Sequence, residues 1–370
     1  MKKIKSRIKR LIHFLNLGWI IGIIRGSKYV LLDAIGTIFF AAVRLLRFAA
    51  SSKTWDENTA KNILVVRNDR VGDLVLSTPA LRALRQKYFD AKIHLLVNKY
   101  AKDLVLNNPN IDKILTEEKE VLNTKYDLAI ALHAGFKQNA ILFQSRADCR
   151  IGFIGAGGGF FLTKKIKDDR RENPRHEIDF TLLAAQKAGA DIDNKKLEVS
   201  ITIQGEKFAD KFYLDNNLAG MTIVIHPGAR QEILRWSKHS FAKLGELLTS
   251  QLKAKIILTG TAKEKELIAD ILCQMKSKPA VCLDIKLTEL VSVLKRASMY
   301  VGNITGPMHI ACALNISVVA ITGLFDSLDD IRYWGPRCDK FEIVRKQGID
   351  AITVEDVYQA VLRLAGENGA

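Results

Sequence analysis

The amino-acid sequence predicts an α/β protein with two Rossmann-like domains that face each other across a cleft. Its 370 residues exceed one ordinary core and fit two domains of roughly 150 residues each plus an extension. Beyond Lys53, short strand-like segments alternate with helix-like segments, which is typical of parallel sheets. The preceding residues differ from this pattern in charge and hydropathy, so an N-terminal extension is expected.

The strand-like segments fall into two series. The first begins with a β-branched apolar run, 63–66, typical of a strand that is buried on both faces. Expected strands lie at 63–66, 93–97, 113–115, 128–132, 222–226, 256–259, 281–283, 299–301 and 318–321. Expected helices lie at 79–88, 101–106 and 354–364, and two polar stretches, 189–196 and 204–217, separate the series. We therefore predict an extension over 1–60 and domains over 61–205 and 206–370.

The extension carries most of the net positive charge. Residues 1–53 hold eleven Lys or Arg against the single acid Asp33, and the whole chain has a net charge of +16. Two apolar runs, 17–24 and 29–43, are each shorter than the ~20 residues that span a bilayer. We expect this segment to be helical and to lie peripherally on the cytoplasmic face of the inner membrane, where basic side chains meet anionic lipid.

The second apolar run has a defined polar side. On a helix, Asp33 and Thr37 fall in one stripe with Arg44 and Arg47, which leaves a broad apolar face. A signal peptide, or a span formed by both runs together, remains an alternative to interfacial binding.

Composition excludes other classes of site and partner. The five Cys lie far apart without a C-x-x-C pair, which argues against a zinc site and a disulfide framework and suits the reducing cytosol. The N-terminal charge accompanies Leu, Ile and Phe rather than a nucleic-acid module, so a membrane surface is expected as partner and nucleic acid is not.

One loop joins the first expected strand to the helix after it. It places Arg67, Arg70, Gly72 and Asp73 at the carboxyl end of the strand, the edge where open α/β sheets bind ligands. A carboxylate there can take a proton from an incoming hydroxyl while Arg and N–H groups hold an anion. Asp73 is therefore a candidate general base, and capping of the helix at 80–88 is the alternative.

Two loops of the second series predict anion binding. The run 226–230, His-Pro-Gly-Ala-Arg, follows a strand and lets the backbone approach a phosphate beside a basic group. The loop 302–309 also follows a strand, and a helix starting near Pro307 would leave the N–H groups around 305–308 free for a diphosphate. The candidate donor-binding residues are His226, Gly228, Arg230, Thr305, Gly306, Pro307, Met308 and His309.

Glu264 lies between these loops in the chain, in the run Thr-Gly-Thr-Ala-Lys-Glu at 259–264. Its carboxylate can accept hydrogen bonds from ribose hydroxyls. The alternative is an acid at a helix start, where the helix dipole favours negative charge.

Together, these motifs resemble glycosyltransferase family 9, the ADP-heptose:lipopolysaccharide heptosyltransferases. The resemblance covers about residues 62–364. It rests on R-x-x-x-x-G-D-x-x-L-x-x-P-A-L ending at Leu81, H-P-G-A at 226–229 and T-G-P-M-H-I-A at 305–311. The resemblance implies a GT-B architecture, in which the N-terminal domain holds the acceptor and the C-terminal domain the nucleotide sugar.

The resemblance also implies roles for single residues. Asp73 would be the catalytic base, Arg235 a phosphate contact and Glu264 the ribose-binding carboxylate. Two positions depart from the family pattern: Ile304 stands where the family usually has Asp, and Ala131 where an acid is common.

The implied reaction is a single inverting step. The acceptor hydroxyl, deprotonated by Asp73, would displace a nucleoside diphosphate from the donor sugar, heptose or similar, possibly from ADP-heptose. The implied acceptor is a lipopolysaccharide-type or other cell-envelope glycan or glycolipid. No metal or cofactor is expected, because the D-x-D at 191–193 falls in a polar stretch that reads as a solvated loop.

Two other functions remain open at this point. A nucleotide-dependent Rossmann oxidoreductase would require G-x-G-x-x-G after a strand, whereas the first strand here is followed by Gly72 alone. The glycine-rich run 155–159 precedes a basic stretch, 164–174, and we expect it to be a mobile loop near the acceptor. A non-catalytic membrane-bound relative of the fold is the other alternative.

Overall fold

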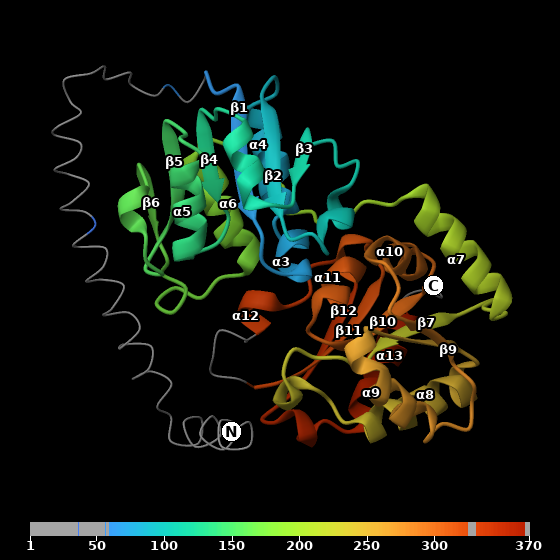
Figure 1. Cartoon of the computed structure of the whole chain (residues 1–370). Coiled ribbons are helices and arrows are strands. Elements are labelled where there is room, and N and C mark those ends of the chain that lie inside the picture. Colours follow the sequence, from blue (N-terminus) through green and yellow to red (C-terminus); the bar gives the residue numbers. More distant parts are fainter. Residues whose placement is uncertain (1–35, 37–55, 57–58, 325–330, 367–370) are drawn as a thin grey trace, which may run out of the picture.

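The computed structural model describes residues 59–324 and 331–366, together with Gly36 and Asp56. Nearly all of the predicted extension, 1–60, and with it the predicted membrane-interface helices, lies outside these residues. Within the described ranges, no helix has both the length and the apolar character needed to cross a bilayer. The described chain forms two parallel six-stranded sheets with helices on their faces (Figure 1).

The first sheet has the strand order β3-β2-β1-β4-β5-β6. Its strands are β1 (Asn62–Arg67), β2 (Lys92–Val97), β3 (Lys113–Leu115), β4 (Leu128–Ala131), β5 (Cys149–Ile154) and β6 (Lys164–Lys167). Its helices are α3 (Val71–Val75), α4 (Thr78–Lys87), α5 (Phe136–Gln144) and α6 (Glu177–Lys187). Ile63 and Val65 pack with buried residues of α4 and α6, whereas Leu64 and Val66 pack with those of α5. The sheet is therefore buried on both faces, as its apolar strands require.

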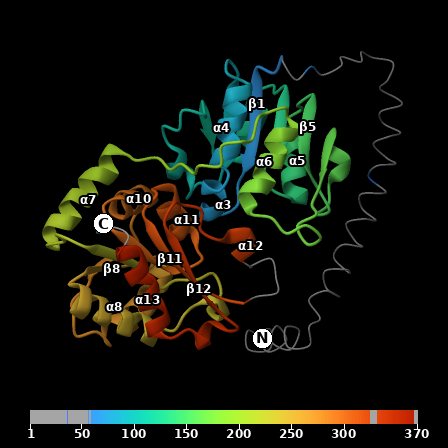
Figure 2. The ribbon, with the colours of Figure 1, turned by 180° about the vertical axis from the view of Figure 1, so that it is seen from behind.

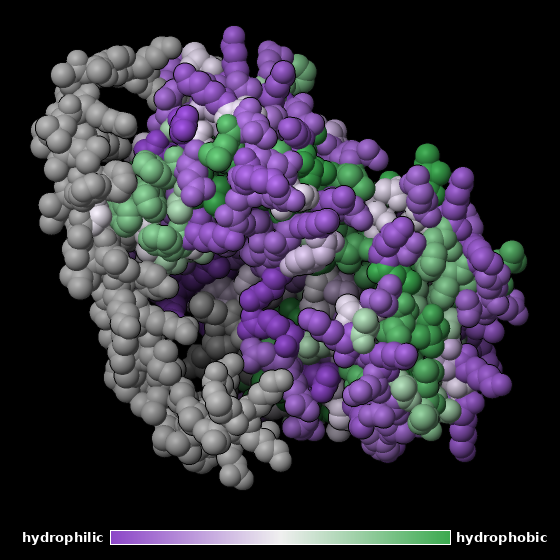
Figure 3. Space-filling view, viewed as in Figure 1, coloured by the Kyte–Doolittle hydropathy of each residue, from purple (hydrophilic) through white to green (hydrophobic). Residues whose placement is uncertain are grey.

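The second sheet repeats this topology, with the order β12-β11-β10-β7-β8-β9. Its strands are β7 (Thr222–His226), β8 (Lys255–Gly260), β9 (Ala280–Leu283), β10 (Met299–Asn303), β11 (Ser317–Gly323) and β12 (Phe341–Lys346). Its helices are α7 (Ile203–Asp215), α8 (Lys238–Leu252), α9 (Lys265–Leu272), α10 (Leu287–Lys295), α11 (Gly306–Ala313), α12 (Ile331–Trp334) and α13 (Val354–Gly366). Polar side chains cover much of the described part of the face in view in Figure 3.

The shared topology explains where the candidate residues lie. Strand order reverses between β1 and β4 in the first sheet and between β7 and β10 in the second. Open α/β sheets bind ligands outside the carboxyl ends of the strands at such a switch point. The loops after β1, β7 and β10 are those that carry Asp73, His226 and Thr305.

Several expectations for single elements need correction. The polar stretch 204–217 contains the helix α7, which packs against α10 and spans the predicted boundary at 205/206. The helix expected over 101–106 is a short 3-10 helix, Lys102–Val105. Strands β5, β6 and β12, and helices α5 and α6, were not expected; β6 forms within the basic stretch that follows the glycine-rich run.

The two halves meet through short helices. Figures 1 and 2 place α3 against α11, and α12 in the gap between the sheets near the loop before α6. A Cβ at Gly72 would lie 2.7 Å from His309 Cδ2, and a Cβ at Gly306 would lie 3.0 Å from Val71 Cγ1. The missing side chains of Gly72 and Gly306 thus permit the close approach of α3 and α11.

Helix α7 should depend on Gly205 for its packing. A Cβ at Gly205 would lie 2.4 Å from the backbone oxygen of Thr288 on α10, so Gly205→Ala must displace α7. We expect a loss of about 1–3 kcal/mol in the free energy of unfolding, measured by urea titration. Gly348→Ala is the control, because its Cβ would meet nothing within 4 Å and its φ is −136°. Equal stabilities of the two variants would contradict this packing.

Candidate active site

Asp73 lies in a short helix of its own at the mouth of the first sheet. It belongs to the first turn of α3 and is 5% exposed. It does not cap the following helix α4, whose N-cap residue is Ser77. The capping alternative is therefore wrong, and the burial of this carboxylate needs another explanation.

The explanation is the guanidinium of Arg67, the last residue of β1, which is 1% exposed. Its Nη2 lies 3.4 Å from Asp73 Oδ1 and 2.9 Å from Glu177 Oε1, and its Nε lies 3.1 Å from Asp69 Oδ1. Arg67 Nη1 also donates to the backbone oxygen of Leu132. One buried cation thus holds three carboxylates from three segments of the chain.

A second cation completes this ion-pair network. Arg170 Nη1 lies 3.2 Å from Glu177 Oε2, and Arg170 Nε lies 3.3 Å from Asp168 Oδ1. Glu177, in the first turn of α6, therefore bridges Arg67 and Arg170. Neither Glu177 nor Arg170 was singled out from the sequence.

Burial sets the proton affinity of the candidate base. Burial raises the pKa of Asp73 above its ordinary value of 3.8, the charge of Arg67 opposes this shift and the charge of Asp69 adds to it. Burial also raises the pKa of Glu177, against the charges of Arg67 and Arg170. A carboxylate with a raised pKa that faces a cleft suits a general base.

The close contact of α3 with α11 brings this carboxylate to the second domain. The imidazole of His309 lies against Gly72, the neighbour of Asp73, and is 3% exposed. Burial lowers the pKa of His309 to about 3, so the ring is neutral near pH 7. The candidate base and the second anion-binding loop are therefore neighbours.

The loop between β10 and α11 offers fewer free N–H hydrogen-bond donors than the sequence predicted. The N–H groups of Met308 and His309 donate to the backbone oxygen of Thr305, and Pro307 has no N–H. The N–H groups of Thr305 and Gly306 remain as the donors at the start of α11. Met308 itself is fully buried in the core, so its predicted contact with the donor is not supported by this geometry.

The first anion-binding loop is fixed by Asn303, the last residue of β10. Asn303 Nδ2 donates to the backbone oxygens of Pro227 and Gly228, and its Oδ1 accepts from Trp236 N–H at 3.1 Å. Asn303 is 1% exposed and ties the two loops together. Its buried position at a strand end is a signal that sequence analysis did not use.

Glu264 lies at the start of a helix, as the alternative interpretation of it expected. Its Oε2 accepts from Thr261 N–H at 2.8 Å and from the Thr261 hydroxyl, which caps the following helix. Its Oε1 points toward the first loop, because a Cβ at Gly228 would lie 1.9 Å from that oxygen. Nearby, His226 Nδ1 lies 3.1 Å from Thr259 Oγ1, and burial lowers the pKa of His226.

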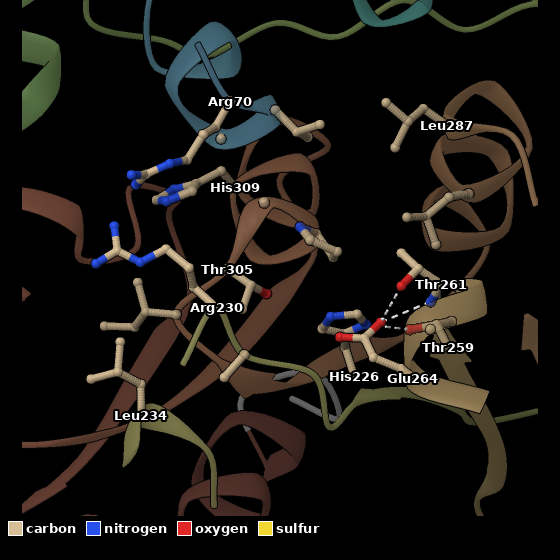
Figure 4. A pocket seen from close by; sticks show the side chains of 18 of the residues that line it. Arg70, His226, Arg230, Leu234, Thr259, Thr261, Glu264, Leu287, Thr305 and His309 are labelled. Carbon is tan, nitrogen blue, oxygen red and sulfur yellow. Dashed lines mark hydrogen bonds between the residues drawn. The ribbon is translucent and has the colours of Figure 1, made fainter. Parts of the chain in front are cut away.

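One cavity of about 440 Å³ between the two sheets is lined by residues of both domains, among them Asp73, His226, Glu264 and His309. Figure 4 shows Arg70, His309 and Arg230 in one part of it and His226, Thr259, Thr261 and Glu264 in another. Cations thus gather where the two domains meet, and hydroxyls and a carboxylate gather over β8. The lining also includes Asp73, Gly72, Tyr100, Leu234, Asp284, Leu287, Leu290, Ile304, Gly306, Pro307 and Trp334.

Arg235 is not brought into this cavity. Its guanidinium lies 3.5 Å from Glu232 within the same turn, while Leu234 and Arg230 line the cavity. The predicted phosphate contact of Arg235 is thus not formed in this geometry. Arg70 lines the cavity, as expected for the loop after the first strand, whereas Tyr100 and Trp334 line it without having been expected, because no local motif marks them.

No metal-binding cluster of three or more His, Cys, Asp or Glu occurs among residues 59–324 and 331–366. Asp191 and Asp193 of the D-x-D are exposed and lie in an irregular segment.

Helix α12 links the cavity to the ion-pair network. Trp334 lines the cavity, and the neighbouring Tyr333 hydroxyl donates to the backbone oxygen of Arg170 at 2.8 Å. His176 Nδ1 accepts from Ile178 N–H, so its Nε2 carries the proton and donates to the backbone oxygen of Gly335 at 3.0 Å. The segment before α6 is thereby tied to the second domain through Arg170 and His176.

Two Rossmann-like sheets, with a cavity between their carboxyl edges that holds Arg, Thr and carboxylate side chains, are typical of two-domain glycosyltransferases that use nucleotide sugars. The family model of glycosyltransferase family 9 (heptosyltransferase) matches residues 115–350. The chain belongs to this family and is a glycosyltransferase. The match begins after Asp73 and therefore does not include the candidate base.

Named relatives agree with this family. The chain is 26% identical over 312 residues to lipooligosaccharide heptosyltransferase 2 of Haemophilus influenzae, covering 77% of this chain and 88% of the relative. It is 23% identical to lipopolysaccharide heptosyltransferase 3 of Escherichia coli, over 80% of this chain and 96% of that relative.

Solved structures share the fold. A glycosyltransferase family 9 protein from Veillonella parvula has a TM-score of 0.77 at 23% identity, covering 84% of this chain and 99% of that one. The ADP-heptose lipopolysaccharide heptosyltransferase II of Escherichia coli has a TM-score of 0.73 at 20% identity, covering 84% and 100%. The predicted GT-B architecture is confirmed.

The raised pKa of Asp73 predicts the pH dependence of catalysis. A general base acts when deprotonated, so kcat/KM should rise with pH through an acid limb that lies above 3.8. Asp69→Asn removes a charge that raises the pKa of Asp73 and should move this limb to lower pH. Asp90→Asn, at an exposed position, is the control. An acid limb that stays in place in Asp69→Asn would contradict the assignment.

Glu264 should contribute to nucleotide affinity. Removing hydrogen bonds to a charged group costs about 1.5–3 kcal/mol, so Glu264→Ala should weaken ADP binding by about tenfold or more in calorimetric titration. Glu232→Ala is the matched control, because its side chain is 88% exposed and does not line the cavity. Equal ADP affinity of both variants would remove Glu264 from the site.

Proposed function

We propose that this chain is an inverting glycosyltransferase that moves heptose or a similar sugar from a nucleoside-diphosphate donor to a lipopolysaccharide-type acceptor. The observation that carries the proposal is the contact of Gly72 with His309, which sets Asp73 beside the start of α11. A base and an anion-binding loop on opposite domains can hold the two substrates of one transfer. The names of the relatives, lipooligosaccharide and lipopolysaccharide heptosyltransferases, support the substrate class.

The chemistry follows from the residues in the cavity. The acceptor hydroxyl attacks the anomeric carbon of the donor sugar, its proton passes to Asp73 and the nucleoside diphosphate leaves with the bonding electron pair. Arg70, Arg230 and the N–H groups of Thr305 and Gly306 stabilise the charge on the leaving diphosphate. The carboxylate of Glu264 accepts hydrogen bonds from the ribose hydroxyls. In this scheme protein cations and N–H groups perform the role that a metal ion would have.

The site of action is proposed from the N-terminal charge. Eleven basic residues against one acid in residues 1–53, interleaved with apolar runs, suit a peripheral position on the cytoplasmic face of the inner membrane. There the chain would meet a nucleotide-sugar donor from solution and a glycolipid acceptor in the bilayer.

Asp73→Asn tests the proposed base. The variant should keep its fold and ADP affinity while turnover falls by ~10² or more, because an amide cannot accept the proton. Release of nucleoside diphosphate in the presence of acceptor is the assay, and Asp90→Asn is the control. Unchanged turnover in Asp73→Asn would place the base elsewhere. Absence of turnover in the unmodified chain with every donor and acceptor tried would favour a non-catalytic relative.

Deletion of residues 1–53 tests the membrane proposal. Each basic residue near an anionic surface contributes ~1 kcal/mol, so the truncated protein should lose binding to anionic vesicles in a flotation assay. Transfer to a soluble acceptor fragment should continue, while transfer to a lipid acceptor in the vesicle should fall. Equal vesicle binding by both forms would overturn the membrane role.

A further inference from the structure

Four phenylalanine rings form a cluster on the outer side of the first domain. Phe136 and Phe143 project from α5, and Phe160 and Phe161 from the 3-10 helix Gly159–Phe161. Phe161 is central, with ring centroids 4.3, 5.0 and 5.8 Å from those of Phe160, Phe143 and Phe136. Figure 3 shows apolar side chains on this side of the first domain.

The cluster is unusual for a surface that meets only water. Phe136 is 43% exposed and Phe143 is 41% exposed, although the α/β core lies directly beneath them. Contiguous exposed aromatic side chains mark an interaction surface more often than a solvated one. The cluster also lies away from the cavity that holds Asp73, so the transfer reaction does not explain it.

Gly36 identifies what meets this surface. It is helical, and a Cβ at Gly36 would lie 2.3 Å from Phe160 Cδ1 and 2.6 Å from Cγ and Cε1. The backbone at Gly36 therefore lies directly on the Phe160 ring, a distance that only glycine permits. Gly36 belongs to the apolar run 29–43 of the N-terminal segment.

We infer that the phenylalanine cluster is the docking site of the chain's own segment 29–43. Because residues three apart share one face of a helix, a helix through Gly36 would turn Asp33 toward the domain. Arg150, whose guanidinium lies 5.9 Å from the Phe143 ring centroid, places a positive charge beside the cluster. The broad apolar face of the run remains on the opposite side.

This arrangement removes a conflict in the sequence. Asp33 is the single acid of an otherwise apolar and basic segment, and an acid within a membrane-facing surface is costly. Docking turns Asp33 toward the protein and leaves the apolar face for the bilayer. The membrane-binding segment is then fixed to the domain that carries Asp73, rather than joined to it by a flexible linker alone.

Chemical cross-linking of the full chain tests the docking directly. Cys273→Ser first removes the exposed native thiol. Gly36→Cys with Phe160→Cys should then be joined by a short bismaleimide at least tenfold faster than Gly36→Cys with Phe89→Cys, where Phe89 is a 79% exposed ring of the same domain. Equal rates for the two pairs would overturn the inference.

A size-compensation series provides an independent test. Gly36→Leu should collide with the Phe160 ring, release the segment and speed its removal by trypsin about tenfold, whereas Gly22→Leu should not. Adding Phe160→Ala to Gly36→Leu opens the space that the ring occupied and should restore resistance. Fast cleavage that Phe160→Ala leaves unchanged would contradict a direct contact.

The docking extends the proposed membrane role, and the two can fail separately. If the full chain binds vesicles but the Gly36→Cys and Phe160→Cys pair is not joined preferentially, the membrane role stands and the docking is overturned. A Phe143→Trp variant distinguishes the remaining possibility in vesicles that contain brominated lipid. Quenching of the fluorescence of the introduced indole would mean that the cluster enters the bilayer itself and would likewise overturn the inference, whereas unquenched fluorescence supports a covered cluster.

Discussion

The buried guanidinium of Arg67 is the constraint on which the site depends. A buried charge is costly unless partners surround it, and removing one partner from a buried pair costs about 3–5 kcal/mol. The partners here are the carboxylates of Asp69, Asp73 and Glu177 and the backbone oxygen of Leu132. They come from the loop after β1, from α3, from α6 and from the end of β4. The interaction that joins these elements therefore also holds the candidate base in place.

The same network reaches the second domain. The carboxylate of Glu177 pairs with both Arg67 and Arg170. The backbone oxygen of Arg170 in turn accepts a hydrogen bond from the Tyr333 hydroxyl on α12. The neighbouring Trp334 lines the cavity. A ligand that filled the cavity would contact α12, which is hydrogen-bonded to Arg170 of the ion-pair network around Asp73, while Gly72 permits the close approach of α3 and α11. Under the proposed function, donor binding and alignment of the base would be parts of one packed arrangement.

Local signals in the sequence predicted much of the fold and part of the site. Apolar runs marked both strand series, and the resemblance of three motifs to a known family led to the GT-B architecture. The same motifs pointed to the loops after β7 and β10, and to Glu264, as candidate donor-binding parts of the site. Edge strands β6 and β12 were missed because their exposed faces are polar, with patterns KKIK and FEIVRK. The partnership of Arg67 with Glu177 could not be predicted, because 110 residues separate them and only the fold joins them. The motif predicted a phosphate contact for Arg235, whose side chain lies beside Glu232 and outside the cavity lining.

The stereochemistry of transfer tests the central claim most directly. A single carboxylate base beside the anion-binding loop allows one displacement at the anomeric carbon, with attack from the face opposite the leaving diphosphate. Proton NMR of the product formed from a donor of known anomeric configuration gives the outcome. Inversion at the anomeric carbon is the predicted result. Retention would require a covalent or shielded intermediate and would contradict the assignment of Asp73 as the base of a single-step transfer.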